Sequence, residues 1–542
     1  MSKTTRQIYN IVDLFAGAGG LSYGFIQTGR YKVVAAFELD ANAQKTYVKN
    51  HGESVKMYSD VEEAIYIDML TKIDNVDVII GGPPCQGFSN ANRQKNYTVC
   101  KNNSLVKCFV KAIHHFKPRA FVMENVSMLQ SKTHRFFVSE NDDDYINKYN
   151  IPTTPSKIFL LDEQFIFEGV IDIVQDIDKL HNYLLDKKSY NTLNIIYKLR
   201  GNPDKLLATI AKHEKRLHEL GLLLSKIIND ESYITSKKRY AGNAITNFFK
   251  NVQTSDNALV LCNEIEPIIS LQRMLLKAIE IHENKIRIIN ISCEQGLVAN
   301  VSSMAIIDYI NYCLTNDNNG YVITTGVLSA TNFGVPQKRK RFVVMGVRKE
   351  YAKKIDLPVG KFTEDNYNNV EDAIKDIETV PPSYDVNEGN IGIQLSKKVN
   401  KLSELGYQLR NSDTLYNHVT TMTTSTAMER FKAIKQGYNF HSLPAKLRKT
   451  YSNSDRTQNT IYLRLRYTEP SGTVVNVRKS MWIHPVLDRA LTIREAARLQ
   501  TFPDSFVFCG TKDSQYQQVG NAVPPLLAKA IAERLCDYLD KK

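Results

Sequence analysis

The sequence predicts an α/β fold built on an open, mostly parallel sheet, and three stretches carry this prediction. Residues 9–37 follow a strand, glycine-rich turn, helix, strand pattern, and 76–80 is a short β-branched run stopped by glycine and proline. A further apolar run, 119–123, ends at Glu124. Reactive groups that directly follow strands are typical of the carboxyl edge of such a sheet, where ligands bind.

The opening stretch predicts a site for a nucleotide-like ligand. A strand at 9–15 precedes the turn 16–20, a helix spans 21–27, and a second strand at 32–37 ends beside Glu38. The glycines allow the backbone to approach a ligand closely, and an acid about 20 residues further on can accept hydrogen bonds from ribose hydroxyls. The turn has a G-x-G-G pattern, which does not favour a dehydrogenase.

The second stretch places a cysteine on a rigid loop. Gly81, Gly82, Pro83 and Pro84 stop the strand, so Cys85 lies just beyond its end. Taken alone, the cysteine could be an ordinary buried thiol, since free cysteine is among the most buried residue types. The third stretch adds a carboxylate at a strand end, for which a solvated loop acid is the alternative interpretation.

Charge and cysteine content narrow the class of protein. The 542 residues carry a net charge of +13, which favours a polyanionic partner. Residues 401–480 hold 13 Lys and Arg against 5 Asp and Glu, whereas 131–300 hold 22 against 22. The eight cysteines show neither zinc-ligand spacing nor a disulfide pattern. With no secretion signal and no apolar run of 18 residues, we expect a reducing, cytoplasmic location and no membrane partner.

The segment 131–300 has a pattern of its own. Apolar residues recur at spacings of three and four along 206–227 and again along 268–282, which predicts two amphipathic helices packed antiparallel. The positive and negative charges of this segment are equal in number, which argues against binding to a polyanion such as DNA. We therefore expect a helical module that contacts another protein or limits access to the ligand site at the sheet edge.

Six segments resemble, in order, the motifs of the bacterial-type DNA (cytosine-5) methyltransferases. They are Asp13–Gly17, Pro83–Ser89, Glu124–Val126, Gln337–Arg341, Arg489–Asp504 and Gly520–Pro525. The resemblance covers roughly 1–130 and 301–542. It implies a Rossmann-like class I methyltransferase sheet in 1–130 and 301–350 and a helical insertion at 131–300. It further implies a smaller, irregular target-recognition domain at 351–480 that binds DNA, and a C-terminal segment, 481–542, that returns to the catalytic domain.

The resemblance also implies a cofactor and site residues. S-adenosyl-L-methionine is the expected cofactor, S-adenosyl-L-homocysteine the product, and no metal is expected. Expected cofactor-binding residues are Phe15, Gly17, Gly19, Glu38, Leu39, Asp60, Pro83, Leu105, Asn521 and Val523. Expected catalytic residues are Cys85, Glu124, Arg339 and Arg341, and expected substrate-binding residues are Gln86, Ser89, Asn125, Val126, Gln337, Arg464 and Arg466. Lys101-Asn102-Asn103 stands where the family has an Arg-Asn pair, which affects cofactor contacts only.

The implied reaction is methyl transfer to C5 of a specific cytosine in duplex DNA, with the base flipped out and Cys85 bonded to C6. Two alternatives are a tRNA cytosine-5 methyltransferase and a catalytically inactive DNA-binding regulator. The loop 83–86 and the basic segment between Arg341 and Arg489 argue against the first, and the intact Cys85, Glu124 and Arg341 argue against the second. Double-stranded DNA is the expected partner, with a cognate restriction endonuclease as a candidate.

Overall fold

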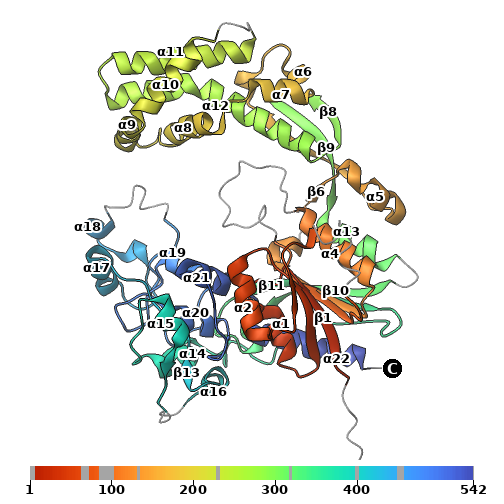
Figure 1. Ribbon diagram of the computed structural model, residues 1–542. Helices are drawn as coiled ribbons and strands as arrows, with labels where there is room; N and C mark the ends of the chain where they lie inside the picture. Colours follow the sequence, from red (N-terminus) through yellow and green to blue (C-terminus); the bar gives the residue numbers. More distant parts are fainter. Residues whose placement is uncertain are drawn as a thin grey trace, which may run out of the picture. The chain divides into compact units, whose positions relative to one another are not determined.

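A computed structural model describes residues 7–62, 73–84, 103–130, 135–227, 232–316, 320–396, 402–448 and 457–540. The chain divides into two compact units (Figure 1). The sheet unit contains the described residues within 1–85, 102–131 and 310–542, and the insertion unit contains those within 132–309.

A seven-stranded sheet organises the sheet unit, in the order β10-β11-β5-β4-β1-β2-β3. Its strands are β1 (Tyr9–Leu14), β2 (Tyr31–Phe37), β3 (Lys56–Tyr58), β4 (Val78–Gly81), β5 (Ala120–Val126), β10 (Tyr321–Ser329) and β11 (Lys340–Arg348). The first five pair in parallel, while β11 runs antiparallel to both β5 and β10. The predicted α/β fold is therefore confirmed, with one antiparallel strand within an otherwise parallel sheet.

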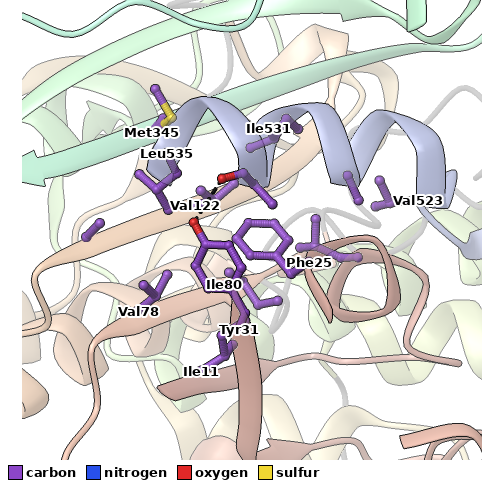
Figure 2. Packing of buried hydrophobic residues seen from close by; sticks show 14 of the residues in the cluster. Ile11, Phe25, Tyr31, Val78, Ile80, Val122, Met345, Val523, Ile531 and Leu535 are labelled. Carbon is purple, nitrogen blue, oxygen red and sulfur yellow. Dashed lines mark hydrogen bonds between the residues drawn. The ribbon is translucent and has the colours of Figure 1, made fainter. Parts of the chain in front are cut away.

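The two ends of the sheet unit meet on one face of this sheet. The helices near it are α1 (Gly20–Ile26), α2 (Ala41–His51), α4 (Asn103–Phe116) and α22 (Pro525–Leu539). A Cβ at Gly24 of α1 would collide with the Pro525 carbonyl oxygen, so glycine lets α1 and α22 touch. Figure 2 shows Tyr31 among the buried side chains, its hydroxyl donating to the Ala532 carbonyl at 2.9 Å. Arg30 pairs with Asp540 at 2.6 Å, as expected for a closing helix.

The rest of the sheet unit, from 351 to 521, consists mainly of short elements. They are α14 (Val370–Ile374), α15 (Val386–Ile391), β12 (Ile393–Gln394), α16 (Glu404–Leu409), β13 (Thr414–Leu415), α17 (Ser425–Ala433), α18 (Ala445–Arg448), α19 (Val477–Ser480), α20 (Ile493–Leu499) and α21 (Lys512–Asn521). A capping box begins α20, where Thr492 and Glu495 satisfy each other's backbone N–H groups, as the Thr-x-x-Glu pattern at 492–495 indicates. Trp482 is fully buried in the core beneath these elements.

The insertion unit combines helices with a small antiparallel sheet. Its elements are β6 (Arg135–Phe137), α5 (Asp143–Tyr149), β7 (Thr154–Leu161), α6 (Val170–Val174), α7 (Ile177–Tyr183), α8 (Lys187–Lys198), α9 (Pro203–Lys212), α10 (Glu214–Ser225), α11 (Tyr233–Lys250), α12 (Ser255–Glu283), β8 (Ile288–Ser292) and β9 (Leu297–Ala305). β9 pairs with β6, β7 and β8. Helix α13 (Ile306–Thr315) follows β9.

The prediction of two amphipathic helices was too simple. The pattern along 206–227 belongs to two helices, because the chain turns at His213 (φ −108°, ψ 13°) between α9 and α10. Leu206 and Leu217 on either side of the break are nevertheless buried in the same core. The pattern along 268–282 lies within α12 as expected. No helix in the described ranges is long and apolar enough to cross a membrane.

Candidate active site

Two sheet strands bring together the predicted acid and one predicted arginine. Glu124 lies on β5 and Arg341 on the neighbouring antiparallel strand β11. The Arg341 Nε atom is 2.6 Å from Glu124 Oε1, and both side chains are largely buried. Arg341 also donates to the Lys340 carbonyl at 2.8 Å, which fixes its direction. Glu124 and Arg341 therefore form an ion pair that is largely shielded from solvent, near the carboxyl end of the central strand β5.

The same strand end holds the loop that leads to the cysteine. Asn125 Nδ2 donates to the Pro83 carbonyl at 2.9 Å. A Cβ at Gly82 would lie 3.1 Å from Glu124 Oε2, so the carboxylate packs directly on the loop backbone. Cys85 follows Pro84 but lies outside the described residues, as do Gln86 and Ser89. The Glu124 carboxylate is therefore positioned against the residues that immediately precede the predicted nucleophile.

Gln337 and Arg339 have internal roles in the structure. Gln337 is fully buried, donates to Gln500 Oε1 at 2.8 Å and accepts from the Val474 backbone N–H at 2.7 Å. Arg339 is 1% exposed and donates to the Val474 and Gly520 carbonyls at 3.0 and 3.2 Å.

These contacts correct the expectation that Gln337 and Arg339 touch the substrate. Burial and the neighbouring Arg341 charge lower the pKa of the Arg339 guanidinium, while Glu124 acts in the opposite direction. Arg339 therefore lies behind the ion pair of Glu124 and Arg341, tying β11 to the later segments.

The turn after β1 is tied to the acid at the end of β2. Phe15, Gly17 and Gly19 all have positive φ, at 57°, 56° and 90°. Glu38 accepts from the backbone N–H groups of Gly17 and Asp40 at 2.8 Å each. A Cβ at Gly17 would meet no atom within 4 Å, so space is open beside this turn.

The remaining predicted cofactor residues border neighbouring elements of the sheet unit. Leu39 is 74% exposed, and Asp60, just past β3, accepts from the Glu62 backbone N–H at 2.7 Å. Leu105 lies half-buried on α4. At the C-terminal segment, Asn521 accepts from Gln517 at 2.8 Å.

The segment after α21 reaches the glycine-rich turn. Val523 is buried, and a Cβ at Gly20 would collide with its carbonyl oxygen. This close approach is the contact that the resemblance implied between the last motif and the first.

A buried polar network beneath the turn was missed in the sequence. Tyr47 donates to Asp13 Oδ2 at 3.0 Å, its hydroxyl oxygen lies 2.9 Å from Ser22 Oγ, and Ser22 Oγ lies 3.0 Å from His51 Nε2. Burial raises the pKa of Asp13 to about 7 and lowers the pKa of His51 to about 4. The sequence held one signal for this network: Asp13 lies within an apolar strand, and a buried carboxyl group needs hydrogen-bond partners.

The recognition segment uses one predicted arginine internally and exposes the other. Arg464 is 4% exposed and donates to the carbonyls of Ile434 and His484 at 2.7 and 3.0 Å and to Asp488 at 2.6 Å. The structure therefore gives Arg464 an internal role, which the sequence did not predict, beside the proposed contact with DNA. Arg466 is half-exposed and pairs with Glu469 at 2.9 Å.

Arg464 and Arg466 lie along one cavity, which has a volume of about 320 Å³. Its lining residues are Gly437, Leu463, Arg464, Leu465, Arg466, Glu469, Pro470, Ser471 and Gly472. Three other polar residues that seemed suited to DNA, Asn417, His418 and Thr420, are buried and bonded within the protein.

Comparison with known proteins identifies the family. The sequence model of the C-5 cytosine-specific DNA methylases matches residues 9–151 and 309–537. The chain belongs to this family. It is a DNA cytosine-5 methyltransferase, and its family uses S-adenosylmethionine. The family match leaves out 152–308, which lie in the insertion unit.

Relatives match over nearly the whole chain. The type II methyltransferase M.DdeI of Desulfomicrobium norvegicum is 25% identical over 98% of this chain and 89% of its own length. The DNA (cytosine-5-)-methyltransferase M.ApeKI of Aeropyrum pernix is 26% identical over 98% and 99%. A solved Escherichia coli structure, described as a prophage-encoded DNA modification methyltransferase, has a TM-score of 0.52, 19% identity and coverage of 98% and 99%. The last of these supports the fold.

Proposed function

We propose that this methyltransferase acts through a covalent bond between Cys85 and C6 of a flipped cytosine, with Glu124 and Arg341 holding the ring. C5 of cytosine is a poor nucleophile until a group adds at C6. The Cys85 thiolate adds there, Glu124 in its neutral acid form donates a proton to N3, and Arg341 binds O2, so that negative charge does not build up on the ring. The base must leave the helix stack, since these atoms are out of reach in a duplex.

The observation that carries this proposal is the ion pair between Glu124 and Arg341, packed on Gly82 and Pro83. The carboxylate and guanidinium lie side by side, as two groups that contact neighbouring ring atoms must. S-adenosylmethionine, when bound, supplies the methyl group that C5 takes up. Release of the C5 proton to water, with return of the N3 proton to Glu124, then allows Cys85 to leave C6 as a thiolate, which restores the aromatic ring.

We further propose that the open space beside Gly17 and Glu38 receives the cofactor. Glu38 already orients the turn through Gly17, and its carboxylate can accept hydrogen bonds from ribose hydroxyls. The positive φ values at Phe15, Gly17 and Gly19 form a tight turn, and a Cβ placed at Gly17 would meet no atom within 4 Å. Asp60, Leu105 and Val523 remain proposed neighbours of the same ligand.

Residues 351–480 are our proposed recognition domain, and 481–542 the proposed return to the catalytic domain. Support comes from the excess of basic residues in 401–480 and from their exposure around α17 and α18. Lys432, Lys435 and Lys446 are exposed there and can contact phosphates, which position the protein on the duplex. Tyr438 is 53% exposed nearby in the chain. We propose a cytoplasmic, DNA-associated location and a cognate restriction endonuclease as a functional partner.

Trapping with 5-fluorocytosine tests the covalent mechanism. Fluorine at C5 cannot leave as a proton does, so a duplex carrying this base at the target should give an adduct that survives denaturation. The Cys85→Ser variant should bind the duplex but form no adduct, because a hydroxyl is far less ionised than a thiol. An adduct formed equally by wild type and variant would refute the assignment of Cys85. Transfer of labelled methyl groups to tRNA in preference to duplex DNA would refute the proposed substrate.

A further inference from the structure

The balanced charge of the insertion conceals two regions of opposite sign. Residues 131–186 carry 5 Lys and Arg against 11 Asp and Glu, whereas 187–250 carry 13 against 5. The positive region corresponds to helices α8 to α11. A charge balance taken over the whole segment is therefore no argument against DNA contact, because phosphate binding depends on local charge.

Helices α10 and α11 form a tightly packed hairpin within this region. A Cβ at Gly242 of α11 would lie 2.8 Å from the Gly221 carbonyl oxygen of α10, so the two backbones touch (Figure 1). Leu217, Leu220 and Leu224 of α10 pack with Ala241 and Ile245 of α11 in one buried core. This packing fixes which faces of the two helices meet solvent.

The solvent face of α11 suits a phosphate backbone. Its 18 residues include Lys237, Lys238, Arg239 and Lys250 but no Asp or Glu. The side chains on this face are Arg239, Tyr240, Asn243, Asn247 and Lys250, and Tyr240 is 51% exposed. Cationic, amide and phenol donors are the groups that bind phosphate oxygens. Lys215 on α10 and Lys226 directly after its end are both exposed, and α10 also exposes Glu214 and Glu219.

Ordinary solubility does not explain this face. Solvated helices usually mix charges of both signs, as α12 does with Glu264, Glu266 and Arg273. Among the described residues, no ion pair involves Arg239, Lys250 or Lys226. Their charges are therefore available to a partner.

We propose that the solvent face of the α10–α11 hairpin is a second DNA-binding surface, which contacts the phosphate backbone of duplex DNA without reading its sequence. The partner follows from the chemistry: a regular polyanion matches a rigid helical face that presents cations and neutral donors but, on α11, no acid. This replaces the expectation of a module for protein contact. The surface lies outside the residues that match the family model.

A matched pair of triple variants tests the proposal. The first is Lys226→Gln, Arg239→Gln, Lys250→Gln in the full chain. The control, Lys157→Gln, Lys179→Gln, Lys285→Gln, removes as many exposed charges from the acidic part and the far end of the same unit. The dissociation constant for a duplex containing the target site is measured between about 50 and 200 mM salt, and methyl transfer is measured at saturating DNA.

We expect the DNA affinity of the first variant to depend less steeply on salt concentration than that of the wild type. Its plot of log affinity against log salt should be less steep by about one unit for each phosphate contact removed, whereas the control should match wild type. Both variants should methylate saturating DNA at the wild-type rate, which separates this surface from the reaction itself. Equal slopes in wild type and the first variant would overturn the proposal. So would an equal loss of slope in both variants, because the effect would then be one of net charge.

Discussion

Two arginines, Arg341 in the sheet and Arg464 in the recognition segment, have opposite surroundings. Arg341 lies on a regular strand, and its guanidinium pairs with Glu124 and makes only one bond to a backbone carbonyl, that of Lys340. Arg464 lies where the chain is irregular, and its guanidinium binds carbonyl groups that no ladder satisfies. Buried backbone groups need partners in either case. In the regular strand the arginine side chain is available for a functional contact, whereas in the irregular segment it is needed to bond backbone carbonyl groups.

The largest expected effect is on the sheet side of this comparison. Glu124→Gln keeps the shape of the side chain but removes the carboxyl proton donor, so methyl transfer should fall by roughly 10²–10⁴-fold. The free energy of unfolding in urea should also fall, by on the order of 3 kcal/mol, because the amide leaves the buried Arg341 charge without its carboxylate. Single-turnover transfer of labelled methyl groups and the urea midpoint measure the two effects. Near-normal transfer would remove Glu124 from the mechanism.

The next effect is on the recognition side. Arg464→Ala leaves the carbonyls of Ile434 and His484 without their donor and Asp488 without its partner, and should destabilise the fold by on the order of 3 kcal/mol. Arg466→Ala is the matched control, because an exposed pair such as Arg466 with Glu469 contributes under about 1 kcal/mol. Thermal unfolding of the two variants checks this. Equal stability would mean that the internal role of Arg464 has been overstated.

A smaller effect concerns pH and again separates the two regions. Burial lowers the pKa of His484 in the recognition core to about 4, and its Nδ1 accepts from the Val486 and Leu487 backbone N–H groups. Below pH 6.5 the His484 imidazole is protonated in the unfolded chain but stays neutral in the folded chain until the pH approaches 4. The free energy of unfolding therefore falls as the pH drops from 6.5 to 4. At pH 5 this loss should reach about 2 kcal/mol.

The glycine-rich turn should behave differently over the same pH range. His51, with its pKa lowered to about 4, loses stability on acidification, but Asp13, with its pKa raised to about 7, gains it, because the folded state holds a proton there. The two contributions oppose each other between pH 7 and pH 5. Replacing either His484 or His51 by Gln should therefore reduce the acid-induced loss of stability between pH 7 and pH 5, whereas replacing Asp13 by Asn should increase it. Urea unfolding at the two pH values measures these changes, and an unchanged or opposite response would contradict the pKa directions.

Much of the fold could be predicted because its signals are local. The apolar runs at β1, β4 and β5 and the capping box at Thr492 and Glu495 each specify one element. The break at His213 could not be predicted, because the apolar period continues through it and Leu206 and Leu217 share one core. The sheet around β9 was also missed, since its strands pair across long stretches of chain.

The site divides in the same way. Glu124 and Arg341 were predicted from motifs on strands, and strand pairing brings them together. The internal roles of Gln337 and Arg464 depend on which distant carbonyls and N–H groups come close, and a sequence does not state this. The network around Asp13 was missed for the same reason, because its partners come from α1 and α2.

The most direct test exchanges each of the two arginines for lysine and measures both reaction and stability. Lysine keeps the charge but loses the planar fork of donors. Single-turnover methyl transfer and the urea midpoint are measured for Arg341→Lys and Arg464→Lys under the same conditions. Our account predicts that Arg341→Lys loses transfer and keeps its midpoint, while Arg464→Lys unfolds earlier and, where still folded, transfers methyl groups normally. Normal stability with lost transfer in Arg464→Lys, or lost stability with normal transfer in Arg341→Lys, would contradict it.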